Sequence, residues 1–265
     1  MSIIQAIIIA IVEGITEFLP ISSTAHMAIT SAIMGIGDDS FTKLFEIVIQ
    51  FGAILSVIVL FWKKFFDFKN FRFYIKLLIA VIPALVIGAL FKKHIESVLG
   101  NPLVIAIIML LGGVLLLFVD KWFDRPLIDD EPKITDRQSL VIGIYQTLAI
   151  VFPGLSRSAA TIIGGMQQRL SRRLAAEFSF FLAVPTMLAA SVKSLYDVHK
   201  DTPELLNGNN MNILLTGCIV AFIVALLAVK LFIGFLQKHG FRLFGYYRIA
   251  AGIILLTLIY SGYIQ

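Results

Sequence analysis

The sequence is poor in the residues that soluble proteins expose. Only 15% of its 265 residues are charged, whereas 58% are hydrophobic; an ordinary soluble domain has about 25% charged residues. The single cysteine, Cys218, leaves no partner for a disulfide within the chain. No basic stretch or small-residue cleavage site opens the sequence, so we expect no secretory signal peptide. The composition predicts one integral membrane domain over residues 1–265.

A net charge of +5 would suit a nucleic-acid-binding protein. In a chain with a mean hydropathy of +0.92, basic loops beside anionic lipid explain the charge better. We therefore expect membrane lipids and no nucleic acid among the partners.

Long apolar runs predict the membrane spans. About 17–25 mostly apolar residues cross a bilayer as a helix. The predicted spans are residues 45–62, 76–92, 102–119, 175–193, 211–233 and 246–263. The polar stretch 120–138 separates the third span from the rest, and we interpret it as a cytoplasmic hinge. The fold class is therefore all-α and polytopic, with about six transmembrane helices.

Two further apolar segments, 3–34 and 139–167, are interrupted in the middle. Pro20 breaks the first segment and Pro153-Gly154 breaks the second, because proline lacks an N–H donor and clashes with the preceding turn. Each segment is predicted to form two half-helices in a re-entrant hairpin. Such a hairpin is tolerated at membrane depth only where protein or a cavity surrounds it.

The two halves of the chain, 1–119 and 139–265, are predicted to be repeats. Pro20-Ile-Ser-Ser-Thr-Ala is matched in kind by Pro153-Gly-Leu-Ser-Arg-Ser-Ala, and Gly112-Gly113 by Ala251-Gly252. Each half has three crossings, an odd number, so the second half is expected to insert inverted, with the site near the midplane. The positive-inside rule then places the basic loops in the cytoplasm and both termini outside.

Residues 13–27 collect polar groups in an otherwise apolar chain. A charged group inside a membrane costs about 2.5–3.5 kcal/mol on insertion scales, so such groups are usually functional. Glu13 and Glu17 are four residues apart and share one helix face. They could hold a divalent cation or divide acid and base roles. The alternative is a protonated, hydrogen-bonded pair.

Ser22, Ser23 and Thr24 begin the second half-helix of the first hairpin. Their hydroxyls and the free N–H groups of a helix N-terminus suit a phosphate. A serine could also act as a nucleophile, and His26, three residues after Ser23, could serve as its base or protonate a leaving oxygen. Simple capping is the alternative for Ser22.

Arg157 is flanked by Ser156 and Ser158 at the second break. A guanidinium there suits a bidentate grip on phosphate; a salt bridge to Glu13 or Glu17 is the alternative. The whole set suits phosphoryl transfer on a lipid that carries phosphate, because charge stabilisation dominates that reaction. A secondary transporter or polyprenyl-phosphate flippase is the main rival, because inverted repeats are common in transporters.

Three segments carry a resemblance: residues 13–26, Pro153-Gly-Leu-Ser-Arg157-Ser, and Ala175–Pro185. They resemble signature segments of bacterial undecaprenyl-diphosphatases, the bacitracin resistance proteins, and the likeness runs from end to end. Ala25 and Ala159 stand where glycine is typical of the family. The resemblance implies hydrolysis of undecaprenyl diphosphate to the monophosphate, which recycles the lipid carrier for cell-wall synthesis and confers bacitracin resistance. It also implies a Mg²⁺ or Ca²⁺ ion and a site at the outer face of the bacterial cytoplasmic membrane.

The resemblance also implies roles for particular residues. Glu13 and Glu17 become metal-binding or acid–base residues, Ser23 the candidate nucleophile, His26 its proton partner and Arg157 the phosphate clamp. Ser22, Thr24, Ser156 and Ser158 would support the phosphate. Whether Ser23 or His26 attacks phosphorus, and whether the protein is a homodimer, are left open.

Overall fold

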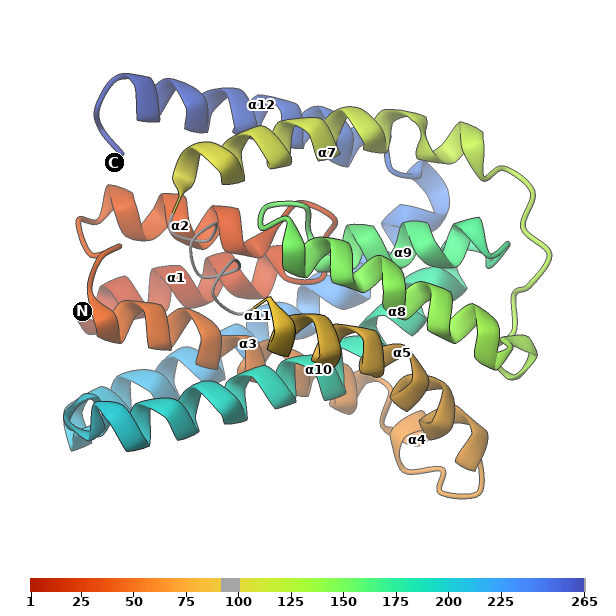
Figure 1. The fold of residues 1–265 in the computed structure, drawn as a ribbon, viewed down its shortest axis with the longest axis horizontal. Helices are drawn as coiled ribbons and strands as arrows, with labels where there is room; N and C mark the ends of the chain where they lie inside the picture. Colours follow the sequence, from red (N-terminus) through yellow and green to blue (C-terminus); the bar gives the residue numbers. More distant parts are fainter. Residues whose placement is uncertain (92–100, 265) are drawn as a thin grey trace.

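The computed structural model describes residues 1–91 and 101–264, and this part of the chain is built from helices joined by short connections (Figure 1). Six of its helices are long and apolar enough to cross a membrane. They are α3 (Ser40–Leu60), α5 (Phe71–Leu90), α7 (Pro102–Trp122), α10 (Arg172–Asp201), α11 (Gly208–His239) and α12 (Arg242–Tyr260). The predicted all-α, polytopic membrane fold is confirmed.

Several of these helices begin earlier in the chain than their predicted spans. Asp39 caps α3 by accepting from Thr42 N, Ser171 caps α10 and Asn207 caps α11. Such caps satisfy the free N–H groups of the first turn, so polar residues outside the apolar run join the helix. The predicted end of the second span, at residue 92, lies outside the described residues.

The two interrupted segments form pairs of short helices. The first pair is α1 (Ile3–Thr16) and α2 (Ser23–Ile33), and the second is α8 (Asp136–Val151) and α9 (Arg157–Gln167). The pairs come in from opposite ends of the bundle, and their turns meet near its middle (Figure 1). Re-entry of each pair into a membrane stays a prediction.

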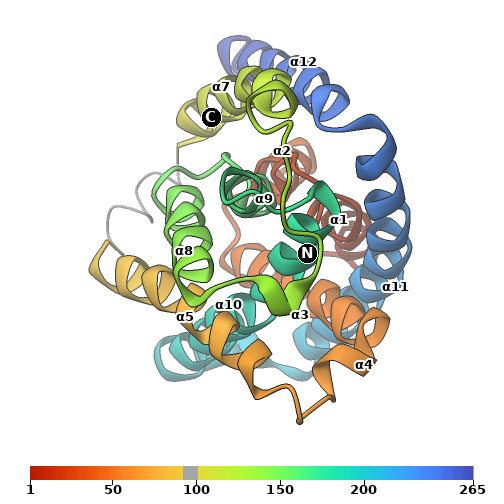
Figure 2. The same ribbon diagram turned by 90° about the vertical axis from the view of Figure 1, so that its right-hand side faces the viewer.

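Helices from the first half of the chain pack against helices from the second half. α1 packs on α11 and α8 packs on α5, while α7 pairs with α12 and α3 with α10 (Figure 2). Gly14 of α1 lies against the Ala221 carbonyl of α11, and Gly143 of α8 lies against the Ala80 carbonyl of α5. Two repeats related by a two-fold axis would produce this packing. The repeat relationship and its inverted insertion stay predictions.

The close approach of α8 to α5 gives a stability prediction. A Cβ at Gly143 would stand 2.3 Å from Ala80 O, a backbone atom that cannot move aside alone. Gly143→Ala is therefore expected to lower the melting temperature in detergent, with overpacking costing about 1–3 kcal/mol. The matched control is Gly88→Ala in α5, where nothing lies within 4 Å of the added Cβ. Equal melting temperatures for both variants would contradict the packing of α8 on α5.

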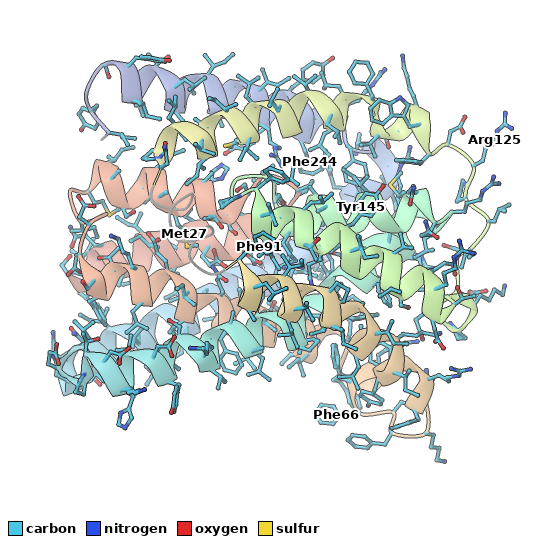
Figure 3. All side chains as sticks on the ribbon, in the orientation of Figure 1. Met27, Phe66, Phe91, Arg125, Tyr145 and Phe244 are labelled. Atoms are coloured by element: carbon cyan, nitrogen blue, oxygen red, sulfur yellow. The ribbon has the colours of Figure 1, made fainter. Side chains whose placement is uncertain are left out.

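The polar segment between α7 and α8 is shorter than the predicted hinge, because α7 continues to Trp122 and α8 begins at Asp136. It contains an isolated parallel β-bridge between Ile128 and Leu170 and a short 3-10 helix, η1 (Glu131–Lys133). Arg125 projects beyond the end of α7 at this end of the molecule (Figure 3).

Glu131 anchors this segment to the neighbouring helices. Its side chain is 5% exposed and pairs with Lys64 at 2.7 Å and Lys76 at 3.1 Å. Burial alone would raise the pKa of Glu131, but the hydrogen bonds from the two lysines outweigh it and lower that pKa. The ion cluster holds the connection against α5 and the short helix α4 (Trp62–Phe65). Phe66, next to α4, points away from the bundle (Figure 3), as expected of a segment at a membrane interface.

Candidate active site

The turn at each helix break has the same local structure. Ser22 and Ser156 have φ angles of 72° and 75°, a region that costs residues other than glycine about 1–2 kcal/mol. Each serine hydroxyl accepts a hydrogen bond from the amide three residues later, Ala25 N at 3.4 Å and Ala159 N at 3.3 Å. Ser22 therefore caps α2, and its part in phosphate binding stays a prediction. Strained backbone of this kind gathers at functional sites.

Glu17 connects the two turns. Its Oε2 accepts a hydrogen bond from Ser23 Oγ at 2.5 Å, and its Oε1 pairs with Arg157 Nη2 at 2.8 Å. The two side chains of the ion pair are 3% and 13% exposed, so the pair lies largely out of water. The alternative named for Arg157, a salt bridge to Glu13 or Glu17, is present with Glu17, and it joins residues 140 positions apart. A carboxylate held against a serine hydroxyl can accept its proton.

One nitrogen of the Arg157 guanidinium has no hydrogen-bond partner among the described residues. Nη1 donates to Ser179 O at 3.0 Å, and the guanidinium lies over the Phe18 ring at 5.9 Å. Arg157 Nε is buried and has no hydrogen-bond partner among the described residues. Arginine always carries a positive charge and five N–H donors, so an unpaired donor of this kind suits an anion. The role of Arg157 as phosphate clamp stays a prediction.

Glu13 lies one helical turn before Glu17 on α1 and is fully buried. Neither oxygen of its carboxylate has a hydrogen-bond partner in the part of the chain that the structure describes. No three His, Cys, Asp or Glu side chains of residues 1–91 and 101–264 converge as a metal site. Mg²⁺ at phosphoryl-transfer sites takes one or two carboxylates and completes its shell with substrate phosphates and water. The orphaned Glu13 beside Glu17 fits such an ion.

His26 and the Ser23 hydroxyl have different hydrogen-bond partners, and that hydroxyl donates to Glu17. Its Nδ1 lies 2.7 Å from Ser22 O, and its Nε2 lies 2.8 Å from Tyr247 Oη. A carbonyl only accepts, so Nδ1 carries the hydrogen; when the ring is neutral, Nε2 accepts from Tyr247 Oη. The two rings are stacked with centroids 5.6 Å apart. The role of His26 as proton partner stays a prediction.

The remaining predicted phosphate contacts divide into two kinds. Ser158 is fully buried; its hydroxyl donates to Leu19 O at 2.8 Å and lies 3.0 Å from Ser156 Oγ. The Ser158 hydroxyl therefore joins one turn to the other, and the parts of Ser156 and Ser158 in phosphate binding stay predictions. Thr24 is half-buried on the first turn of α2, and its part in phosphate binding stays a prediction.

Three residues at the site were not predicted from the sequence: Ser179, Tyr247 and Arg248. Ser179 supports both Arg157, through its carbonyl, and Thr161, whose hydroxyl lies 2.6 Å from Ser179 Oγ. Tyr247 holds His26. Arg248 is fully buried and donates to carbonyls of both turns. A charged residue inside the predicted span 246–263 was the available signal for Arg248, because charge within a span usually has a function.

Comparison with known proteins shows the family to which the chain belongs. The family model described as bacitracin resistance protein BacA matches residues 6–254. A Flavobacterium psychrophilum protein named undecaprenyl-diphosphatase is 57% identical over 97% of this chain and 96% of its own length. Proteins of the same name from Porphyromonas gingivalis and Aquifex aeolicus are 51% and 43% identical, over 99% and 94% of this chain and 98% and 96% of their own lengths. With a family match of this extent and relatives this similar along their whole length, the chain belongs to the bacitracin resistance protein BacA family.

Proposed function

We propose that this protein is a membrane phosphatase that hydrolyses undecaprenyl diphosphate to undecaprenyl phosphate and inorganic phosphate. The names of its relatives support the substrate. The observation that carries the proposal is the contact of Ser23 and Arg157 with the two oxygens of Glu17. This contact brings together the Ser23 hydroxyl, the Glu17 carboxylate as proton acceptor and the Arg157 guanidinium as the proposed phosphate-binding cation. The three groups lie where the two helix breaks meet. Recycling of the lipid carrier and bacitracin resistance would follow from this activity.

The chemistry starts with the terminal phosphate at the two turns. A phosphate oxygen would take the unused Nε–H of Arg157 and compete with Glu17 for the guanidinium. Glu17, less engaged by the cation, would then accept the Ser23 proton. Ser23 Oγ would form a bond to the terminal phosphorus while the bond from phosphorus to the bridging oxygen breaks, releasing undecaprenyl phosphate. Water would hydrolyse the phosphoserine to inorganic phosphate and restore the serine.

A Mg²⁺ or Ca²⁺ ion is part of the proposal. Glu13 and Glu17 would hold it, and when bound it would supply charge neutralisation on the diphosphate. Placing the active site at the outer face of the bacterial cytoplasmic membrane is also proposed, and the distribution of basic loops supports it.

A transporter or flippase is less well supported. Fold does not decide function, but a site can. Substrate transport gives no reason for a serine hydroxyl held on a buried carboxylate.

The test is phosphate release from undecaprenyl diphosphate by the purified protein in detergent with Mg²⁺. We expect turnover, loss of activity when the divalent ion is chelated, and recovery on adding it back. A phosphoserine trapped at Ser23 would support this residue as the nucleophile. Absence of phosphate release from the folded, metal-supplied protein would refute the function.

A further inference from the structure

Arg248 of α12 is a fully buried cation outside the set described as the reacting groups. Within residues 1–91 and 101–264, no carboxylate lies at ion-pair distance from it. Its guanidinium instead donates to backbone carbonyls alone. Nε donates to Met109 O at 3.1 Å, Nη1 to Pro20 O at 3.3 Å and Leu155 O at 2.7 Å, and Nη2 to Gly154 O at 2.9 Å.

Three of these four carbonyls belong to the turns of the candidate active site, Pro20 to one turn and Gly154 and Leu155 to the other. Pro20 and Gly154 each stand two residues before a capping serine, Ser22 in one turn and Ser156 in the other. One guanidinium therefore donates hydrogen bonds to equivalent carbonyls, Pro20 O and Gly154 O, in the two turns. It also grips α7 through Met109. A planar guanidinium presents its donors in a fixed geometry, so it sets the spacing between the groups that it joins.

The surrounding helices leave room for this one side chain. A Cβ at Gly112 of α7 would stand 2.3 Å from Arg248 Nη2, and a Cβ at Gly113 would stand 2.9 Å from Arg248 Cβ. The glycine pair thus forms the wall against which Arg248 lies. A charged side chain inside a membrane protein costs free energy, so one that is present usually has a function.

We propose that Arg248 is a positioning residue that holds the two turns in register, so that Ser23 and Glu17 from one meet Arg157 from the other. Arg248 acts through the backbone of the turns and needs no contact with the substrate. The inference rests on the proposed function for its kinetic consequence, whereas its structural consequence can be measured without substrate.

The kinetic test uses three variants of the full chain in detergent. Arg248→Met removes every donor, Arg248→Lys keeps the charge without the fork, and Gly112→Ala keeps the arginine but displaces it. A misplacement of about 1 Å can cost about 100-fold in rate. We expect Arg248→Met and Gly112→Ala to lose about that factor in kcat with little change in KM, and Arg248→Lys to recover part of it. Gly234→Ala is the control, because nothing lies within 4 Å of its added Cβ.

The structural test measures the distance between spin labels at Ile33 of α2 and Gln167 of α9, both exposed, in a Cys218→Ser background. Arg248→Met should shift or broaden the distance distribution, and Gly234→Ala should not. Wild-type kcat in folded Arg248→Met would overturn the proposal, as would a loss of kcat with an unchanged distribution. If Arg248→Met does not fold, Gly112→Ala and Arg248→Lys decide by the same two measurements. If the wild-type protein releases no phosphate, the proposed function fails, while the label distances still decide the role of Arg248.

Discussion

Glu17→Gln is expected to lower kcat for diphosphate hydrolysis by about 1,000-fold, within the range of general acid–base catalysis. Glutamine can still accept a hydrogen bond from Ser23, so the site should keep its shape. It cannot take the serine proton, and it no longer pairs its charge with Arg157. The measurement is phosphate release from undecaprenyl diphosphate by the purified variant under saturating substrate.

The control for this variant is Glu177→Gln. Glu177 lies near the start of α10 and its partner is Arg173, at 3.5 Å, so it shares no contact with Ser23 or Arg157. We expect this variant to keep wild-type kcat. A Glu17→Gln protein that turns over at the wild-type rate would show that another group receives the proton, and His26 would be the first to examine.

Arg157→Lys is expected to lower kcat/KM by about 100- to 1,000-fold, the usual cost of removing one preorganised donor from a developing charge. Lysine keeps the positive charge but has a single ammonium in place of the planar fork. It cannot contact Glu17, Ser179 O and a phosphate oxygen together, as the arginine geometry allows. Steady-state kinetics on the purified variant measure the effect.

The matched control is Arg125→Lys, because the Arg125 side chain is 88% exposed at the far end of the molecule. We expect the Arg125→Lys variant to keep the wild-type kcat and KM. Arg157→Met adds a stability readout: the buried Glu17 carboxylate would lose its cation, which costs about 3–5 kcal/mol. The role of Arg157 as phosphate clamp would be excluded if Arg157→Lys kept both kcat and KM.

Much of this arrangement could be predicted from the sequence, because burying a polar residue in an apolar membrane protein costs free energy and such residues are therefore few. Glu17, Ser23 and Arg157 stood out for that reason, and Pro20 and Pro153-Gly154 marked the helix breaks. The structure brings these features together. Helix ends were less predictable, since caps such as Asp39 and Asn207 lengthen the helices beyond their apolar runs.

Other parts of the site depend on contacts that no local pattern reveals. Ser22 and His26 are close in sequence to Ser23, yet His26 is held by Tyr247, 221 positions away. Ser179 acts through its backbone carbonyl, which every residue type possesses. For Arg248 the sequence shows a cation within a span, but its partners are four carbonyls from three distant segments.

The place of Arg248 also bears on how a chain of this kind could arise. In the predicted repeat, Gly112-Gly113 pairs with Ala251-Gly252, which makes Met109 the counterpart of Arg248, and Arg248 Nε donates to the Met109 carbonyl. If the predicted repeat holds, counterparts that touch lie where two copies of a half-length ancestor would have met. In such a pair both copies would bring the same residue to the contact, and two guanidinium groups would repel each other away from water. A single arginine at this contact requires that the two halves differ in sequence. The halves of a fused chain can differ, whereas two identical subunits cannot.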